Sequence, residues 1–212
     1  MKRSFDLTIS ALGFIVLSPL LVWIAWKIKN EDGGSIFYRG LRVGRHGKPF
    51  RIFKFRTMVV DAEKIGPSST ASEDSRITRT GKFLRKHKLD ELPQLFNVLL
   101  GQMSFVGPRP EVKRFTDMYT EEEKAVLAVR PGITDWASIW NCDEGSILAG
   151  ADDPDQAYME LIRPTKLKLQ LKYVREASFF ADLKIILLTL LTIIKPANHT
   201  ALKIRKDLSN LN

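Results

Sequence analysis

The chain has 212 residues, which is long enough for one sizeable domain and short for two. Its hydrophobic content of 44% and charged content of 27% are typical of a globular protein and exclude a wholly disordered chain. The 33 Lys and Arg residues outnumber the 24 Asp and Glu residues, so the net charge is +9 and polyanionic partners are favoured: nucleic acid, an anionic membrane surface or phosphorylated substrates.

An uncharged stretch of twenty residues, Leu7 to Trp26, lies near the N-terminus. As a straight helix it would be about 30 Å long, which is the thickness of a bilayer core. Pro19 cannot donate a hydrogen bond to the Ile15 carbonyl, so the pair Ser18-Pro19 predicts a break in the helix. The Ser18 hydroxyl can satisfy a freed carbonyl one turn back.

The charges that flank this stretch have the same sign at both ends. Because basic residues prefer the cytoplasmic side, they favour a membrane hairpin that enters and leaves by one face. A spanning anchor with a proline kink is the alternative, and no small-x-small cleavage site follows to indicate a signal peptide. We therefore expect a re-entrant helix-break-helix over residues 1–29 and a cytoplasmic domain over residues 30–212. The flanking residues are Lys2, Arg3, Lys27, Lys29, Arg39, Arg42 and Arg45.

A β-hairpin is predicted after the membrane segment. Two aromatic and β-branched runs between residues 35 and 58 flank a glycine-rich turn at Gly44 to Pro49. Period-two geometry puts Lys54 and Arg56 on one face and two phenylalanines on the other. The polar stretch Asp61 to Ser75 then predicts a loop, and Thr80 to Lys88 a short basic helix.

The C-terminal third is less patterned. Residues 143–164 have turn and acidic character, and a helical stretch follows to Val174. A second apolar run, Phe179 to Pro196, has an uninterrupted part too short to span a bilayer. It is interpreted as a core helix, with a helix in the membrane interface as the alternative. The apolar face in question consists of Leu183, Ile186, Leu187 and Leu190.

An acidic pair opens the stretch "LDELPQLFNVLLGQMSFVGPRPE", Leu89 to Glu111. Asp90 resembles a helix N-cap, with Glu91 and Pro93 in the first turn, and local pattern favours that structural role over catalysis. A helix N-terminus also favours ionised carboxylates and attracts phosphate. One carboxylate of such a pair can attack phosphorus while its neighbour holds a divalent cation.

The residue types in the chain limit which metals it can bind and which residues can bind phosphate. Cys142 is the only cysteine, which allows no intrachain disulfide, and the three histidines lack the spacing of a zinc site. Any metal site would therefore use oxygen ligands, which favours magnesium or manganese. Arg109, held between two prolines, presents a guanidinium that suits phosphate. The candidate phosphate-binding residues are Lys54, Arg56, Arg76, Arg85, Arg109 and Arg130.

The stretch Leu89 to Glu111 closely resembles the signature of the bacterial sugar transferases, the monotopic phosphoglycosyl transferases. The resemblance covers nearly the whole chain, and its central motif is long and specific. Its further parts are "KRSFD" at Lys2 to Asp6, the Ser18-Pro19 break, "KFRTM" at Lys54 to Met58, "RPGIT" at Arg130 to Thr134, and "SFFADLKII" at Ser178 to Ile186.

The resemblance implies an enzyme whose catalytic domain faces the cytoplasm at the bacterial inner membrane. It implies that Asp90 attacks the β-phosphate of a UDP-sugar and expels UMP, and that the phosphosugar then passes to a polyprenyl phosphate. Glu91 would bind Mg²⁺. This reaction is the first membrane step in the assembly of a bacterial glycan such as an exopolysaccharide or lipopolysaccharide.

Three positions depart from the family pattern. Asp135 stands where glycine is more frequent, and Ser138 stands where glutamine is usual. Gln170 occupies the place of a frequent aspartate, which puts a metal or substrate role of that position in doubt. The stretch from Asn141 to Gln170 also looks longer than in the smallest members, so the resemblance implies little about its contacts.

The expected fold is α+β: a mostly helical cytoplasmic domain with a small β-hairpin and interfacial helices, anchored by the re-entrant helix. Two non-catalytic alternatives are a membrane-tethered basic binding module and a scaffold for other glycan enzymes, with Asp90 merely a cap. We expect no nucleic-acid partner, because the arginines are spread along the chain and no nucleic-acid motif occurs. A homo-oligomer is compatible with the sequence.

Overall fold

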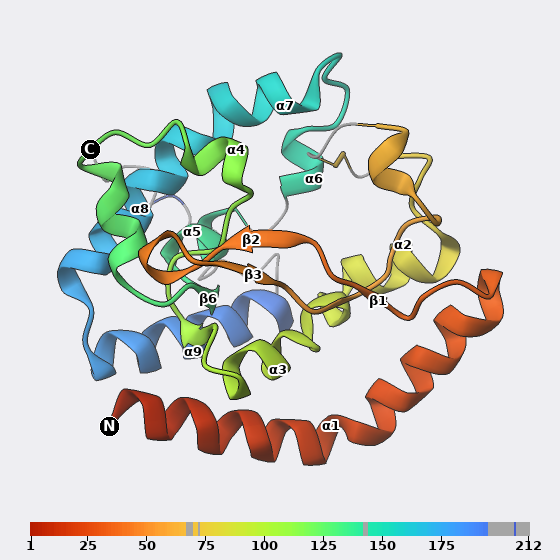
Figure 1. Ribbon diagram of the computed structural model, residues 1–212, viewed down its shortest axis with the longest axis horizontal. Helices are drawn as coiled ribbons and strands as arrows, with labels where there is room; N and C mark the ends of the chain where they lie inside the picture. The colour runs from red at the N-terminus through yellow and green to blue at the C-terminus, as the bar shows by residue number, and fades with distance from the viewer. Residues whose placement is uncertain (67–69, 72, 142–143, 195–205, 207–212) are drawn as a thin grey trace.

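A long N-terminal helix runs along one side of a mostly helical α+β body in the computed structural model (Figure 1), which confirms the expected fold class. The structure describes residues 1–66, 70–71, 73–141, 144–194 and 206. The helices are α1 (Lys2–Asp32), α2 (Arg79–Lys86), α3 (Gln94–Leu99), α4 (Lys113–Thr116), α5 (Trp136–Trp140), α6 (Glu144–Ile147), α7 (Pro154–Ala157), α8 (Arg163–Glu176) and α9 (Phe179–Ile194). The 3-10 turns are Arg45–Gly47, Ala62–Lys64, Leu89–Glu91 and Glu123–Ala128, and Tyr158–Ile162 is a π-helical turn. The strands are β1 (Phe37–Tyr38), β2 (Leu41–Val43), β3 (Pro49–Arg51), β4 (Lys54–Phe55), β5 (Ser104–Val106) and β6 (Gly132–Thr134).

Helix α1 contains the expected proline and bends about halfway along its length (Figure 1). The Ser18 hydroxyl donates a hydrogen bond of 2.8 Å to the Ile15 carbonyl, the group that Pro19 leaves without a backbone donor. The hydrogen bond predicted for Ser18 is confirmed, whereas the predicted break is a bend within one helix. The helix is continuous through the bend and ends later than expected, at Gly33, which adopts a left-handed φ of 72°.

The beginning of α1 is fastened to the domain by polar contacts. Lys2 pairs with Asp182 of α9 and donates a bond of 3.0 Å to the Val106 carbonyl. Arg3 donates to the Val98 carbonyl at 2.8 Å. Buried Asp6 accepts a bond of 2.7 Å from Ser104. The "KRSFD" motif is therefore the polar attachment of the N-terminal helix.

The far end of α1 is fastened to the same domain. Asp32 forms an ion pair with Arg56. Ile24 and Ile28 pack in a buried apolar cluster with Phe55 of β4 and with a leucine of α2. The middle of the helix is different: around Pro19, most apolar side chains are exposed, and Ile15 and Val16 are 69% and 74% exposed. By length and composition α1 is long and apolar enough to cross a membrane.

The predicted hairpin is present as two short antiparallel ladders. Strand β2 pairs with β3, and β1 pairs with β4 beyond it. The connecting turn begins at Gly44, whose amide bonds the Lys48 carbonyl at 2.8 Å, as the glycine-rich sequence indicated. The hairpin places Lys54 at the start of β4, where its side chain turns toward the domain interior.

A parallel strand pair, β5 with β6, was not predicted from the sequence. Gly107 and Gly132 face each other beside this pair, and a Cβ on Gly132 would lie 2.1 Å from the Gly107 nitrogen. Only glycine permits this approach. Because the strands are parallel, their carboxyl ends meet at one edge, which brings together the two segments that follow, Pro108–Glu111 and Asp135–Trp140.

Helix α9 corrects the core-helix interpretation of the second apolar run. Its inner face carries Ile185, Asp182 and Thr192, which are buried, whereas Leu187 is 59% exposed and Leu183 and Leu190 are exposed too. The outward face is therefore the apolar one.

Part of the predicted loop 61–75 lies outside the described residues, and its described part includes the 3-10 turn Ala62–Lys64. Residues 142–143 and the tail beyond residue 194, Lys206 excepted, also lie outside them.

Candidate active site

The acidic pair lies in a 3-10 turn, Leu89–Glu91, and not at a helix cap. Helix α3 begins three residues later at Gln94, and neither the turn nor the helix has a side-chain cap. The turn is entered through Lys88, which adopts a left-handed φ of 55° that is unfavourable for a residue with a Cβ. The N-cap interpretation of Asp90 is therefore wrong, because the following helix begins only at Gln94 and has Pro93 at its N-cap position.

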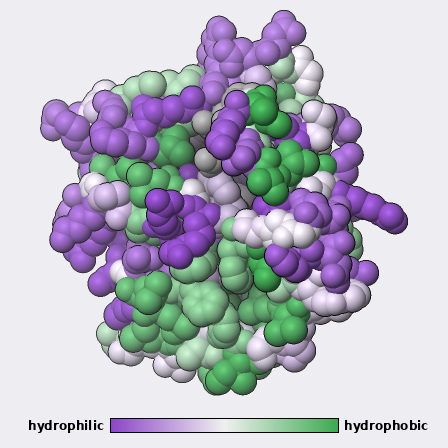
Figure 2. Space-filling model, turned by 45° about the vertical axis from the view of Figure 1, so that its right-hand side comes forward, coloured by the Kyte–Doolittle hydropathy of each residue, from purple (hydrophilic) through white to green (hydrophobic). Residues whose placement is uncertain are grey.

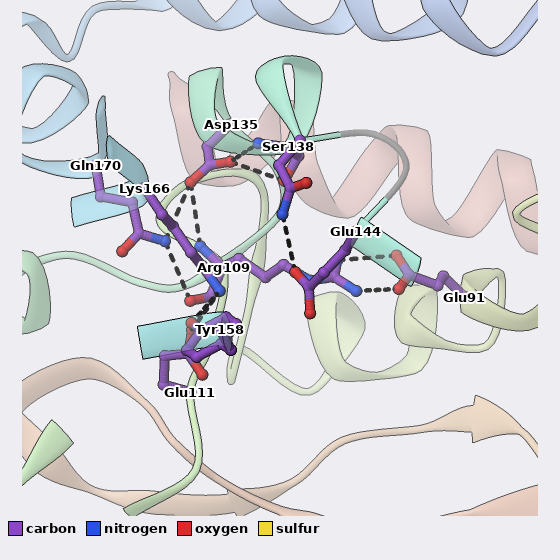
Figure 3. A network of polar contacts seen from close by, with 10 residues as sticks. Glu91, Arg109, Glu111, Asp135, Ser138, Glu144, Tyr158, Lys166 and Gln170 are labelled. Atoms are coloured by element: carbon purple, nitrogen blue, oxygen red, sulfur yellow. Dashed lines mark hydrogen bonds and ion pairs between the residues drawn. The ribbon is translucent and has the colours of Figure 1, made fainter. Parts of the chain in front are cut away.

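Glu91 is held by two cations. The Arg109 guanidinium binds it through both terminal nitrogens, one of them at 3.0 Å, and the Lys54 ammonium donates to it at 2.7 Å. Figure 3 shows Arg109 extended toward Glu91. Although burial acts in the opposite direction, Arg109 and Lys54 hold the pKa of Glu91 well below its ordinary value. Glu91 is therefore a stable carboxylate at neutral pH.

Asp90 has the opposite electrostatic environment. Its side chain is buried, at 9% exposure for the residue, and receives no hydrogen bond within the described part of the chain. Burial and the neighbouring charge of Glu91 raise the pKa of Asp90, although Lys54, Arg85 and Arg109 counteract them. A carboxylate that is desolvated and free of donors has lone pairs available for an electrophile.

Arg85 approaches the pair from α2. Its Nε donates a bond of 2.9 Å to the Thr57 hydroxyl, and burial lowers its pKa although Asp90 opposes the shift. The close approach of α2 depends on Gly81, where a Cβ would lie 2.0 Å from the Thr57 carbonyl oxygen. Lys54, Arg85 and Arg109 thus form a cationic ring around Asp90 and Glu91.

The other three predicted phosphate ligands are directed elsewhere. Arg56 pairs with Asp32 at the end of α1. Arg76 pairs through two nitrogens with Asp74 and lies in the electrostatic neighbourhood of Arg85. Arg130 donates a bond of 3.0 Å to the carbonyl of Gly101. The structure therefore brings three of the six predicted basic residues to the carboxylate pair.

Arg109 is also held through its backbone. Its amide donates to the Asp135 carboxylate at 3.3 Å, and its carbonyl accepts a bond of 3.3 Å from the Gln170 side chain (Figure 3). Gln170 in turn donates to the same oxygen of Asp135 at 3.3 Å. Two of the three departures from the family pattern, at positions 135 and 170, are therefore in contact with each other and with Arg109.

A buried cluster next to Arg109 holds the adjoining Glu111. The Glu111 carboxylate accepts a bond of 2.5 Å from Tyr158 and pairs with Lys166 of α8. Despite burial, Lys166 lowers the pKa of Glu111, and Glu111 raises that of Lys166 well above its ordinary value. Lys166 and Gln170 lie one turn apart on α8, so this helix supports the Pro108–Glu111 segment from behind.

Sequence reasoning missed the acidic residues that surround these cations. Glu144, from α6, raises the pKa of Arg109 together with Glu91, and Figure 3 shows it beside the Arg109 side chain. No local signal in the sequence relates a glutamate in this turn-rich stretch to an arginine thirty-five positions earlier. Asp135 was noted as unusual, but its partner depends on the parallel pairing of β5 and β6.

Apolar side chains gather over the lower part of the molecule in Figure 2, where α1 runs in Figure 1. The exposed apolar residues of α1 and α9 contribute to the surface on this side, and Lys27 lies over the rings of Trp23 and Trp26 at the far end of the α1 stretch. Tryptophans and lysines at the end of an apolar helix are typical of a membrane interface.

Fold and site together define an α+β enzyme with a carboxylate pair in a cationic ring beside a long apolar helix. The profile described as Bacterial sugar transferase matches residues 1–196 of this chain. The chain therefore belongs to the bacterial sugar transferase family.

Individual relatives agree with this assignment. The chain is 36% identical over 189 residues to the sugar transferase EpsL of Bacillus subtilis (strain 168), which covers 89% of this chain and 85% of that protein. It is 36% identical over 204 residues to the exopolysaccharide production protein ExoY of Sinorhizobium fredii, with 89% and 83% covered. It is 39% identical over 196 residues to the undecaprenyl-phosphate glucose phosphotransferase of Komagataeibacter xylinus, of which it covers 35%. The chain thus spans most of the first two proteins and about a third of the last.

Proposed function

We propose that this protein transfers a sugar-1-phosphate from a UDP-sugar to a polyprenyl phosphate, with Asp90 as the nucleophile. The observation that carries the proposal is the buried carboxylate of Asp90, which accepts no hydrogen bond from the residues that the structure describes and lies beside a carboxylate held by two cations. The names of several relatives support the substrate classes, since these proteins are called undecaprenyl-phosphate sugar phosphotransferases or sugar-1-phosphate transferases.

The reaction proceeds in two displacements at one phosphorus atom. An Asp90 oxygen attacks the phosphorus that carries the sugar, the bond from this phosphorus to the bridging oxygen breaks, and UMP leaves with the electron pair. A phosphate oxygen of the polyprenyl phosphate then attacks the same phosphorus, and the Asp90 carboxylate leaves with its electron pair. The lipid product is a polyprenyl diphosphate sugar, and the free carboxylate is regenerated.

The cationic ring supplies the electrostatic part of catalysis. Arg109 presents a planar guanidinium that matches two phosphate oxygens, and Lys54 and Arg85 add two further positive charges around Asp90. These charges offset the repulsion between the carboxylate and the diphosphate, and they stabilise the negative charge that accumulates on the departing UMP.

Magnesium suits this site as a partner of few protein ligands. The described residues contain no group of three or more His, Cys, Asp or Glu side chains that could hold a metal ion. Mg²⁺ is commonly bound by one or two carboxylates together with substrate phosphates and water, so the oxygens of Glu91 fit it, in competition with Lys54 and Arg109. When bound, the ion would neutralise charge on the diphosphate.

We also propose that α1 is re-entrant and that the domain faces the cytoplasm at the inner membrane. Support comes from the attachment of both ends of α1 to the same domain, through Lys2 to Asp182 and through Asp32 to Arg56. A spanning helix would place these ends on opposite sides of the bilayer. The exposed apolar surface around Pro19 is the part that would lie in lipid, next to the polyprenyl acceptor.

The test is a burst experiment without the lipid acceptor. Purified protein given a UDP-sugar and Mg²⁺ is expected to release UMP in a burst of up to one per active site, and to gain the mass of a phosphosugar on a peptide that contains Asp90. Asp90→Asn is expected to abolish both, because an amide is a poor nucleophile. Full transfer activity in Asp90→Asn would refute the covalent route, and absence of Mg²⁺-dependent UMP release with any UDP-sugar in the presence of polyprenyl phosphate would refute the function.

A further inference from the structure

We propose that Asp135 and Gln170 are positioning residues that determine where Arg109 presents its guanidinium to the donor diphosphate. This inference rests on the proposed function for the identity of the ligand, but its structural part is independent of it. The two residues act through the backbone of Arg109, on the side opposite to the bond between its side chain and Glu91 (Figure 3).

The Pro-Arg-Pro segment has one backbone donor. Pro108 and Pro110 have no amide hydrogen, so the Arg109 amide is the sole N–H in this tripeptide. That amide is directed at Asp135, and the Arg109 carbonyl is directed at the amide group of Gln170. Both backbone polar groups of Arg109 are therefore fixed by side chains from elsewhere in the chain, one at the N-cap of α5 and one within α8.

Asp135 is suited to this role because every group around it donates. One of its oxygens accepts from the Ser138 amide and the Ser138 hydroxyl, each at 2.7 Å, and the other accepts from Arg109 and from Gln170. An asparagine at this position has only one acceptor oxygen, so its NH₂ group would face at least one donor. The network requires a carboxylate, and Asp135 is fully buried.

A fully buried carboxylate costs desolvation energy that a neutral residue would avoid. Arg109 offers a reason for its presence, since its positive charge lies within electrostatic reach of Asp135 as well as of Glu91. The Arg109 cation is thus placed between a carboxylate that holds its backbone and a carboxylate that holds its side chain. Glu91 is the exchangeable partner because it is beside the reacting phosphate, whereas Asp135 holds its position without contacting the substrate.

The experiment compares wild type with Asp135→Asn and Gln170→Met in the full-length protein in lipid nanodiscs. The first readout is hydrogen exchange at the Arg109 amide. Its sequence neighbours, Pro108 and Pro110, have no amide hydrogen that would add to the signal. We expect this amide to lose protection in Asp135→Asn. The second readout is steady-state kinetics, in which KM for the UDP-sugar is expected to rise about tenfold while kcat changes less, because about one charge-assisted pair is misaligned.

Gln170→Met tests the same network with less risk to the fold. It preserves side-chain length but removes the donor to the Arg109 carbonyl, so we expect a smaller rise in KM than for Asp135→Asn. The matched control is Asp153→Asn, which alters an aspartate that also caps a helix, α7, but is exposed. Asparagine is an equally good cap there, so KM and Arg109 exchange are expected to stay at wild-type values.

Two outcomes would overturn the proposal. One is unchanged protection of the Arg109 amide in Asp135→Asn, which would mean that the carboxylate does not hold it. The other is lost protection with unchanged KM, which would mean that the contact is structural only. A wild-type protein that neither binds nor cleaves UDP-sugars would refute the proposed function instead, and the exchange readout would still decide whether Asp135 holds Arg109.

Discussion

Two isosteric substitutions at neighbouring positions are expected to change stability in opposite directions. Glu91→Gln removes the charge that Lys54 and Arg109 bind, whereas Asp90→Asn removes a buried charge that no donor among the described residues binds. Both variants should lose transfer activity. Their stabilities should differ: Glu91→Gln is expected to unfold more easily than wild type, and Asp90→Asn is expected to resist unfolding.

The cost of Glu91→Gln follows from three charge-assisted hydrogen bonds. The side chains of Glu91, Lys54 and Arg109 are 18%, 20% and 30% exposed, so the ion pairs are mostly but not fully shielded from water. Breaking such a pair by removing one partner costs about 2 to 4 kcal/mol once this exposure is taken into account. At about 2 to 4 °C per kcal/mol, the unfolding midpoint should fall by about 4 to 16 °C.

The effect of Asp90→Asn has the opposite sign. Burial raises the pKa of Asp90, so ionisation of this group destabilises the folded state at neutral pH. Removal of the charge should add about 0.5 to 2 kcal/mol, the range of common stabilising substitutions. The gain is complete above the raised folded pKa and disappears as pH falls below the pKa of an unfolded aspartate.

The pH dependence of Glu91 differs from that of Asp90. Its folded pKa is well below its ordinary value, so its contribution is present above the pKa of an unfolded glutamate and is lost as pH falls through the lowered folded pKa. Mild acidification should therefore erase the advantage of Asp90→Asn before it reduces the cost of Glu91→Gln.

The assay is thermal unfolding in nanodiscs at several pH values, with Glu121→Gln as a control. Glu121 forms an exposed ion pair with Lys124, whose loss should change stability by less than about 1 kcal/mol. Equal destabilisation by Asp90→Asn and Glu91→Gln would refute the reasoning, because it would mean that Asp90 too is held by donors in the folded protein.

Three further expectations concern the membrane helix, the arginine and the attachment of α1. Labels at residues 2 and 40 should both be accessible only from the cytoplasmic side, and labels on opposite sides would contradict a re-entrant helix, while Pro19→Ala should straighten α1 and favour a spanning topology in the same assay. Arg109→Lys should raise KM for the UDP-sugar by about tenfold or more, since an ammonium cannot bind two phosphate oxygens in parallel, and an unchanged KM would show that the guanidinium does not contact the diphosphate. Asp182→Asn removes the charge that pairs with Lys2 and should increase proteolysis near the N-terminus in nanodiscs, whereas an unaltered cleavage pattern would mean that the remaining bonds suffice.

Much of the fold could be predicted because its signals are local. The bend at Pro19 of α1 and the glycine-rich hairpin turn each follow from a few adjacent residues, and both are present, although α1 bends without breaking. The β5–β6 pair was missed because three-residue strands have no periodicity that distinguishes them from loops. The orientation of α9 was misjudged because buried Asp182 and Thr192 lie on its inner face, where a core helix normally has apolar residues.

Part of the candidate site could likewise be predicted from the sequence, and part of it could not. Asp90, Glu91 and Arg109, all chosen from the sequence, lie near one another in the structure, but local pattern favoured a cap role for Asp90 because Pro93 fits a first helical turn. Lys88 adopts a left-handed backbone before the acidic pair, and a lysine in a sequence gives no signal of a positive φ. The contact between Asp135 and Gln170 depends on tertiary pairing and could not be read from their neighbours.

The attachment of Lys2 to Asp182 has a consequence for biogenesis. These residues are 180 positions apart, so at about 5 to 20 residues per second the ribosome needs about 10 to 40 s to make the second after the first. During that interval α1 has left the ribosomal tunnel before its partner residue in α9 is made. Ser104, which donates a hydrogen bond to Asp6, is also made later than α1. Insertion of the apolar segment into lipid can thus precede docking of the domain. A nascent chain stalled before position 182 would carry an inserted helix whose first turn lacks the ion pair between Lys2 and Asp182.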